Sequence, residues 1–288
     1  MSVPLGTRNL LSSAGAASLL DNKRQQSADG VGMERINIKG RVVETYMSGS
    51  GPALLFLHAE DFFTQHLLFL DQLARHFRVI APRHPGFGHS TLPDGFRTVD
   101  DLAYHTMDLI DALKLNDVTL VGASMGGWIA TEICVKSTQN IARLALLGSV
   151  GIKFGGRDDR DFADLYALPA QDVARLLFHH PEKFAPDYAQ ITDDAALEIA
   201  RDRQSAGYFL WKPFMHNPGL RKWLHRVQIP ALVIGGAQDG FIVHGHTGKL
   251  AEALPNGRAL IIANAGHYPQ IEQTDAVAAA IVAFAQRA

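Results

Sequence analysis

The sequence has little from which to build a disulfide, a membrane span or a nucleic-acid surface. Its 288 residues contain one cysteine, Cys134, so no intrachain disulfide can form, and a reducing compartment fits this composition. No uninterrupted run of about 18 apolar residues occurs, which argues against a transmembrane helix. The 27 Lys and Arg nearly balance the 29 Asp and Glu, so no basic surface for nucleic acid is expected.

The first 32 residues lack the alternating pattern that follows them. Arg8 precedes a stretch rich in Leu, Ala and Ser that faintly resembles a secretory signal. That apolar stretch is short and is broken by Ser and Gly. We therefore interpret residues 1–32 as an N-terminal extension and expect a cytoplasmic protein.

From Met33 onward, short β-rich runs alternate with helical runs, which is typical of a mostly parallel central sheet flanked by helices. A hairpin is expected over 35–46, with Lys39 and Gly40 in its turn. Thr98 and Thr274 are expected to cap two amphipathic helices. Continuous apolar runs predict six further strands, each covered on both faces, at 53–57, 77–81, 118–121, 141–147, 231–234 and 259–262.

The alternation stops between residues 151 and 228, where helical spacing continues without strand-like runs. The strand pattern resumes afterwards, so an inserted helical cap is favoured over a separate helical domain. We divide the remainder into a core made of two parts, 33–150 and 229–288.

A serine stands in the most informative motif, Gly122-Ala-Ser124-Met-Gly126, between an apolar strand and a helix. This is the context of a nucleophile elbow, where a sharp turn exposes the serine hydroxyl and flanking glycines admit neighbouring backbone. The Met125 N–H at the start of the next helix can stabilise an oxyanion. The alternative is a glycine-rich turn with an ordinary serine.

A serine nucleophile needs a base and an orienting acid, and both follow later strands. Asp239 lies just past the apolar run that begins at Ala231, and His267 lies just past the last one. All three residues would then meet at the carboxyl edge of one sheet. We predict the triad Ser124, His267 and Asp239.

These motifs resemble the α/β-hydrolase superfamily, in its branch with a helical cap, from about residue 33 to the end. The resemblance implies that His58, Ala59 and Glu60 form the loop that usually reads His-Gly-x, so that the Glu60 N–H is the second oxyanion donor. Ala59 departs from the usual glycine. The segment 83–90 resembles a family loop that shapes the pocket wall, without its usual aspartate.

Within this superfamily, a serine at the nucleophile position is a feature that this chain shares with esterases, carbon–carbon hydrolases and haloperoxidases, which it resembles in this respect. Ser-Met-Gly-Gly and a helical cap resemble the meta-cleavage-product hydrolases, in which Arg201 or Arg203 would match a basic cap residue. Ala123, Tyr268 and the 59–61 loop depart from that group, so hydrolysis of a small carboxylic ester is the leading hypothesis. Carbon–carbon hydrolysis of a vinylogous diketone and a non-catalytic small-molecule receptor are the alternatives.

Substrate contacts are expected from the oxyanion loop, from the cap and from the residue after His267, namely His58, Ala59, Arg201, Tyr208, Trp211 and Tyr268. The alternative for the cap residues is ordinary packing or a solvated helix face. His244 and His246 resemble a metal pair without a third ligand, so we expect neither a metal nor a cofactor. A small-molecule substrate is the expected partner, and the sequence leaves a homo-oligomer open.

Overall fold

The computed structural model describes residues 32–286, so the expected N-terminal extension, apart from Gly32, lies outside the described residues. Its strands are β1 (Met33–Ile38), β2 (Arg41–Ser48), β3 (Ala53–Leu57), β4 (Arg78–Pro82), β5 (Val118–Ala123), β6 (Ile141–Leu147), β7 (Ala231–Gly236) and β8 (Gly257–Ile262). They form one sheet in the order β1-β2-β4-β3-β5-β6-β7-β8. The pairings of β1 with β2 and of β2 with β4 are antiparallel, and the other strands pair in parallel.

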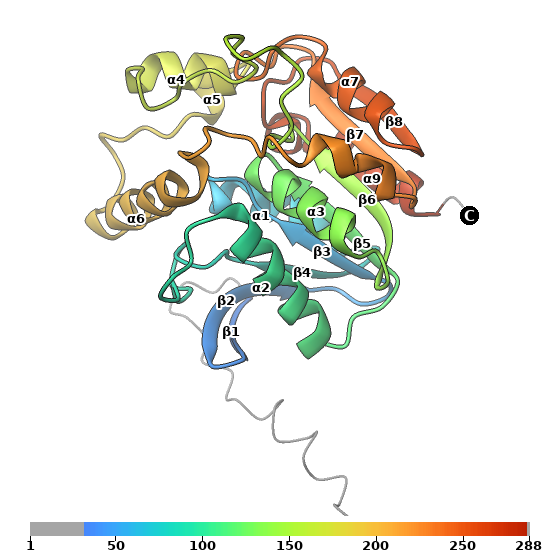
Figure 1. Ribbon diagram of the computed structural model, residues 1–288. Coiled ribbons are helices and arrows are strands. Elements are labelled where there is room, and N and C mark those ends of the chain that lie inside the picture. Colours follow the sequence, from blue (N-terminus) through green and yellow to red (C-terminus); the bar gives the residue numbers. More distant parts are fainter. Residues whose placement is uncertain (1–31, 287–288) are drawn as a thin grey trace, which may run out of the picture.

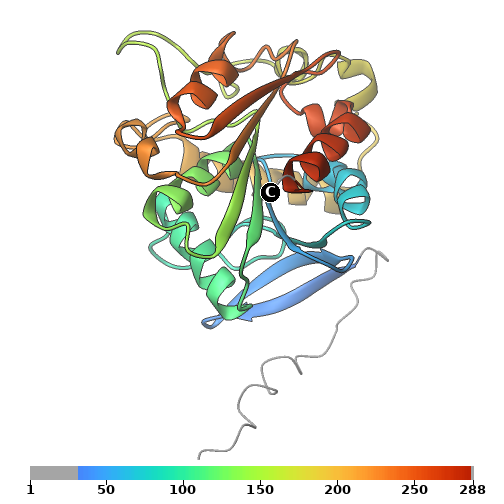
Figure 2. The same ribbon diagram turned by 90° about the vertical axis from the view of Figure 1, so that its right-hand side faces the viewer.

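Helices cover both faces of this sheet (Figures 1 and 2). On one face α2 (Val99–Ala112), α3 (Met125–Lys136), η3 (Arg221–Arg226) and α7 (His246–Ala253) contact one another in sequence. On the other face η2 (Phe63–His66), α1 (Leu67–Leu73), α8 (Pro269–Glu272) and α9 (Thr274–Gln286) pack together. All residues of β5 are buried between these layers, which explains why every residue of that strand except Thr119 is apolar.

Local sequence rules account for the β1–β2 turn and for the start of α2. The hairpin turn has Lys39 and Gly40 at φ 51° and 84°, as a two-residue turn between twisted strands requires. The Thr98 hydroxyl accepts the Asp101 N–H while the Asp101 side chain accepts the Thr98 N–H, which completes a capping box at the start of α2.

Two expectations about local structure were wrong. Thr274 is the first residue of α9, and its hydroxyl donates to the carbonyl oxygens of Gln270 and Ile271 instead of capping the helix. Strand β8 is an edge strand with residues such as Ile261 exposed, so it is not covered on both faces. Its apolar run did not reveal this, because the position of a strand in the sheet is set by topology.

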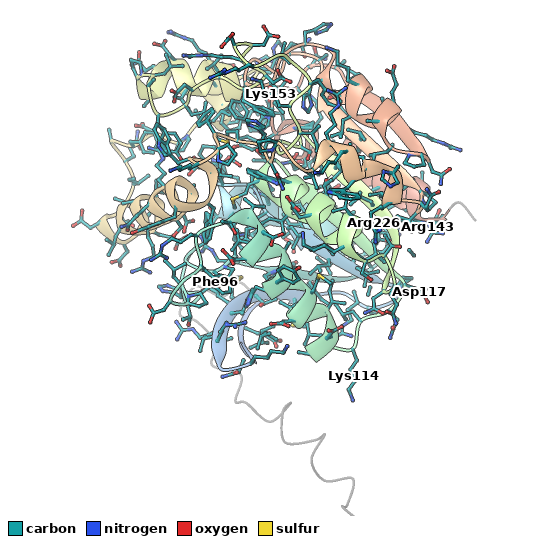
Figure 3. The ribbon with its side chains drawn as sticks, in the orientation of Figure 1. Phe96, Lys114, Asp117, Arg143, Lys153 and Arg226 are labelled. Atoms are coloured by element: carbon teal, nitrogen blue, oxygen red, sulfur yellow. The ribbon has the colours of Figure 1, made fainter. Side chains whose placement is uncertain are left out.

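The segment between β6 and β7 contains α4 (Ala170–Leu177), α5 (Pro181–Phe184), α6 (Asp193–Leu210) and then η3. Within residues 32–286 no helix combines the length and apolar character needed to span a bilayer. In Figure 3, Lys153 follows the carboxyl end of β6, whereas Lys114 and Asp117 precede β5 at the opposite end of the molecule. Helices α4 and α5 lie at the end marked by Lys153 (Figure 1).

A buried ionic cluster attaches α6 to the loop after β4. The Arg83 guanidinium lies 2.8 Å from Asp202 and 2.7 Å from Glu198 of α6, and 3.6 Å from Glu44 of β2. The other Asp202 oxygen accepts the Gly88 N–H at 2.7 Å. Because the Arg83, Asp202 and Glu44 side chains are at most 9% exposed, each charge depends on the others for compensation.

We expect Arg83→Met to lower the free energy of unfolding by about 3–5 kcal/mol, because it leaves two buried carboxylates without their cation. Arg175→Met is the matched control, since the Arg175–Asp172 pair is exposed and should contribute less than about 1 kcal/mol. Urea unfolding followed by circular dichroism measures both variants. Equal midpoints for the two variants would contradict the role given to Arg83.

Candidate active site

Ser124 occupies the sharp turn between β5 and α3. Its backbone has φ 47° and ψ −112°, a region that residues with a side chain rarely adopt, and its side chain is buried. The turn is possible because its neighbours are glycines: a Cβ at Gly126 would overlap the carbonyl oxygen of Leu57, and one at Gly122 would overlap that of Gly126. The hydroxyl is thereby held at the carboxyl edge of the sheet.

His267 joins Ser124 to Asp239 through its two ring nitrogens. Nε2 lies 2.9 Å from the Ser124 Oγ, and Nδ1 lies 3.0 Å from the Asp239 Oδ2. The other Asp239 oxygen accepts the N–H groups of Phe241 and Ile242 at 2.9 and 3.0 Å. A carboxylate held in this way accepts a hydrogen bond from a protonated Nδ1. The Nε2 atom is then unprotonated and can accept the serine proton.

The segment between β6 and β7 contacts the backbone of His267. The His267 N–H donates to the carbonyl oxygen of Leu177, the last residue of α4, at 2.8 Å. The Gly240 N–H, beside Asp239, donates to the Leu176 carbonyl oxygen at 3.1 Å. The end of α4 therefore contacts the loops after both β7 and β8, which carry the acid and the base.

A carboxylate occupies the expected oxyanion position. The Met125 N–H donates to the Glu60 Oε2 at 3.3 Å, and the Tyr268 hydroxyl donates to the Glu60 Oε1 at 2.9 Å. Glu60 and Tyr268 are both buried. The sequence placed Glu60 here for its N–H and missed this use of its side chain. The acidic residue in a normally glycine-rich loop was the available signal.

Both ring nitrogens of His58 contact backbone groups of neighbouring loops. Its Nε2 accepts the His84 N–H at 2.9 Å, its Nδ1 contacts the Ala59 carbonyl oxygen, and its ring stacks on that of His84 at 4.0 Å. Burial lowers the pKa of His58 well below its usual value, which keeps the ring neutral. This arrangement favours a structural role for His58 and for the buried Ala59 over the substrate contact expected from the sequence.

The three cap residues expected at the substrate lie apart from the triad. Arg201 donates to the Gly88 carbonyl oxygen at 2.9 Å and lines, with Tyr208, a cavity of about 410 Å³. Trp211 is 58% exposed and lines a different cavity of about 430 Å³. Ser124 lines neither of these two cavities, and substrate contact by the three side chains stays a prediction. The face that α6 presents to the core carries Asp202 and Ser205 instead.

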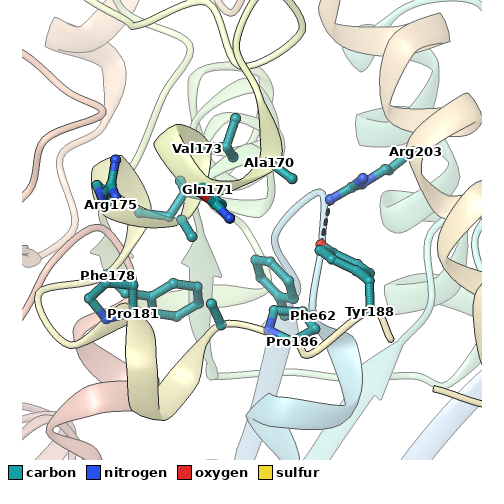
Figure 4. Close-up of a pocket in the computed structure, with 13 residues that line it drawn as sticks. Phe62, Ala170, Gln171, Val173, Arg175, Phe178, Pro181, Pro186, Tyr188 and Arg203 are labelled. Atoms are coloured by element: carbon teal, nitrogen blue, oxygen red, sulfur yellow. Dashed lines mark hydrogen bonds between the residues drawn. The ribbon is translucent and has the colours of Figure 1, made fainter. Parts of the chain in front are cut away.

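A third cavity, of about 290 Å³, lies beneath α4 and α5 (Figure 4). Phe62 and Phe178 line it, and each of their rings lies 5.6 Å from that of Tyr268. The Tyr268 ring in turn lies 4.7 Å from the His267 ring. Phe62 has the uncommon backbone φ of 64°, a strain that marks many functional loops. Tyr268 was expected at the substrate from the sequence, whereas Phe62 was not.

Charged groups stand at the rim of the same cavity. Arg203 lines it, donates to the Tyr188 hydroxyl at 2.7 Å and lies 3.8 Å from the Asp61 carboxyl group. Burial, with a smaller contribution from the charge of Glu60, raises the pKa of Asp61 to about 7, although Arg203 opposes the shift. The Asp61 carboxyl group is therefore subject to the opposite charges of Glu60 and Arg203.

Among residues 32–286 no cluster of three His, Cys, Asp or Glu side chains could hold a metal ion. Of the two histidines that resemble a metal pair, His246 forms a hydrogen bond between its Nε2 and the Ile152 carbonyl oxygen at 2.8 Å.

Known proteins resemble this chain in sequence and in fold. The chain is 26% identical over 215 residues to a 2-hydroxy-6-oxo-2,4-heptadienoate hydrolase of Pseudomonas putida, covering 71% of this chain and 76% of the relative. It is 29% identical over 218 residues to a 2-hydroxymuconate semialdehyde hydrolase of Pseudomonas putida, covering 72% and 76%. A crystal structure of a serine hydrolase involved in carbazole degradation superposes with a TM-score of 0.71 at 24% identity, covering 88% and 97%.

The model of the alpha/beta hydrolase fold family matches residues 52–274, a range that contains the strands from β3 to β8 and all three residues of the hydrogen-bonded chain. The resemblance found in the sequence is thus confirmed at the level of fold and family. This protein belongs to the alpha/beta hydrolases.

Proposed function

We propose that this protein is a serine hydrolase that forms an acyl-enzyme at Ser124, with His267 as base and Asp239 as its orienting acid. One observation carries the proposal: the hydrogen bonds from Ser124 through His267 to Asp239 measure 2.9 and 3.0 Å. A hydroxyl becomes nucleophilic at neutral pH only beside such a base. An intact chain of this kind favours catalysis over a receptor role.

In the proposed reaction, the Ser124 Oγ attacks a carbonyl carbon while its proton passes to His267. The developing imidazolium is stabilised by Asp239 and then protonates the leaving group. In the second half of the reaction, His267 takes a proton from water while the water oxygen attacks the acyl carbon. His267 then returns the proton to the Ser124 Oγ as the acid product leaves. The Met125 N–H, at the start of α3, stabilises the oxyanion once the Glu60 carboxylate has left it.

A small, neutral carboxylic ester is the proposed substrate. The Glu60 and Asp61 carboxyl groups repel a negatively charged substrate, and the nearby cation Arg203 is already engaged by Asp61 and Tyr188. The cavity beneath α4 and α5 is lined mainly by apolar residues such as Phe62 and Phe178. We also propose that residues 151–228 form a cap, whose α4 and α6 contact the loops at the carboxyl edge.

Carbon–carbon hydrolysis is the second candidate, and the relatives favour it. Two of them are named as hydrolases of a heptadienoate and of a muconate semialdehyde. Such a reaction requires a cationic clamp on the acidic end of the substrate. Arg201 donates to the Gly88 carbonyl oxygen, which leaves Arg203 as the better placed of the two arginines expected from the sequence.

A fluorophosphonate should add once to the protein, because a base-activated serine attacks its phosphorus atom. Intact-protein mass spectrometry should show one adduct, and peptide mapping should place it on Ser124. Ser124→Ala should abolish the adduct, whereas Ser137→Ala, which alters a serine at the end of α3, should retain it. Labelling that persists in Ser124→Ala would refute the nucleophile.

The substrate class is tested by comparing an aryl acetate with a coloured ring-fission dienoate. We expect measurable ester hydrolysis and slow loss of the dienoate, because the carboxyl groups near the site oppose its negative charge. Absorbance assays at equal enzyme concentration give the two values of kcat/KM. Fast dienoate loss that collapses in Arg203→Ala, with Arg258→Ala as the control because Arg258 is exposed on β8 and lines none of the three cavities, would favour carbon–carbon chemistry.

A further inference from the structure

The Glu272 carboxylate lies beside the loop that carries His267. Glu272 is the last residue of the short helix α8, and only 8% of it is exposed. Its Oε2 accepts the Gly266 N–H at 2.6 Å and the His179 N–H at 3.1 Å, and its Oε1 accepts the His180 N–H at 2.9 Å. One side chain therefore joins the residue before His267 to the turn between α4 and α5.

The same two segments also pack main chain against main chain. A Cβ added at Gly266 would lie 2.6 Å from the Leu177 carbonyl oxygen and 2.9 Å from the His179 nitrogen, so a larger residue would force the segments apart. The His267 N–H donates to that Leu177 oxygen at 2.8 Å. The main chain of His267 is therefore fixed by the end of α4 and by the turn that Glu272 holds.

The position of His267 decides whether Ser124 can lose its proton, because the transfer requires the 2.9 Å contact between the Ser124 Oγ and the His267 Nε2. A shift of about 1 Å in a reacting group can lower a rate roughly a hundredfold. Hydrogen bonds to an ionised acceptor are stronger than those between neutral groups. Three such bonds make the Glu272 carboxylate an effective support for this loop.

We propose that Glu272 is a positioning residue for His267: its carboxylate keeps the turn between α4 and α5 closed on the loop that carries the base. The inference rests on the proposed function of Ser124. Glu272 acts through main-chain groups and exchanges no proton with the substrate. The turn also carries a wall of the cavity beneath α4 and α5, since Phe178 and Pro181 line it (Figure 4). The cavity wall and the base are thus held by one carboxylate.

Two rates that both require His267 test this role, namely turnover of an aryl acetate and fluorophosphonate labelling of Ser124. Glu272→Ala should lower kcat and the labelling rate roughly a hundredfold, with a much smaller change in KM, because the base is displaced. Glu272→Gln keeps one oxygen for the Gly266 N–H, so each rate should lie only roughly tenfold below the wild type. A residue that merely stabilises the fold would leave both rates unchanged below the unfolding temperature.

Glu132→Ala is the matched control. Glu132 in α3 is also a buried carboxylate, and its hydrogen-bond donors belong to Trp128, Lys136 and Asn217 instead of the His267 loop. This variant should unfold at a lower temperature and retain both rates. Equal rate losses in the two alanine variants, or Glu272→Ala rates within about threefold of the wild type, would overturn the proposal. Wild-type rates in Glu272→Gln would also overturn it, and they decide the matter if Glu272→Ala does not fold.

Amide hydrogen exchange followed by mass spectrometry tests the contact itself, independently of activity. In Glu272→Ala, exchange should accelerate together in peptides covering residues 176–182 and 263–268, whereas Glu132→Ala should leave both peptides near the wild type. Acceleration confined to one peptide would contradict the link between the turn and the base. Absence of a Ser124 adduct in the wild type would refute the proposed function itself, whereas a wild-type adduct with unchanged kinetics in Glu272→Ala would refute the positioning role alone.

Discussion

The hydrogen bond between the His267 Nε2 and the Ser124 Oγ depends on the whole sheet, because it joins residues 143 positions apart. Ser124 follows β5 and His267 follows β8, with β6 and β7 lying between those two strands. Parallel pairing brings the carboxyl ends of these strands to one edge. The strained backbone of Ser124 and the glycines around it then aim the hydroxyl at the imidazole.

The cap segment is joined to this edge by two kinds of contact. At α4, main-chain carbonyl oxygens accept N–H groups from the loops that carry Asp239 and His267. At α6, the Asp202 carboxylate meets the Arg83 guanidinium in a buried ionic cluster. The first contact positions the base, and the second fixes the helix beside the loop after β4. The same segment therefore contacts both the loops that carry Asp239 and His267 and the loop after β4.

The parts of the site that depend on local sequence could be predicted. The sharp turn at Ser124, the order of Ser124, Asp239 and His267 along the chain and the apolar strands follow from patterns within a few residues. In the structure, hydrogen bonds join these three side chains. The residues around the substrate could not be predicted in this way. Arg201 was expected at the site, but the orientation of α6 turns Asp202 and Ser205 toward the core instead. The Glu60 carboxylate is oriented by Tyr268, which is 208 residues away, so its loop sequence alone could not show its position.

Turnover by Asp239→Asn tests the account of the triad most directly, because this change keeps the shape of the side chain and alters what it offers to His267. With an aryl acetate as substrate, kcat should fall by roughly ten-thousandfold, since an amide no longer stabilises the imidazolium or selects the required tautomer. Thermal unfolding followed by circular dichroism should match the wild type, which would exclude a loss of fold. Turnover within about tenfold of the wild type would contradict the role of Asp239 and the triad built on it.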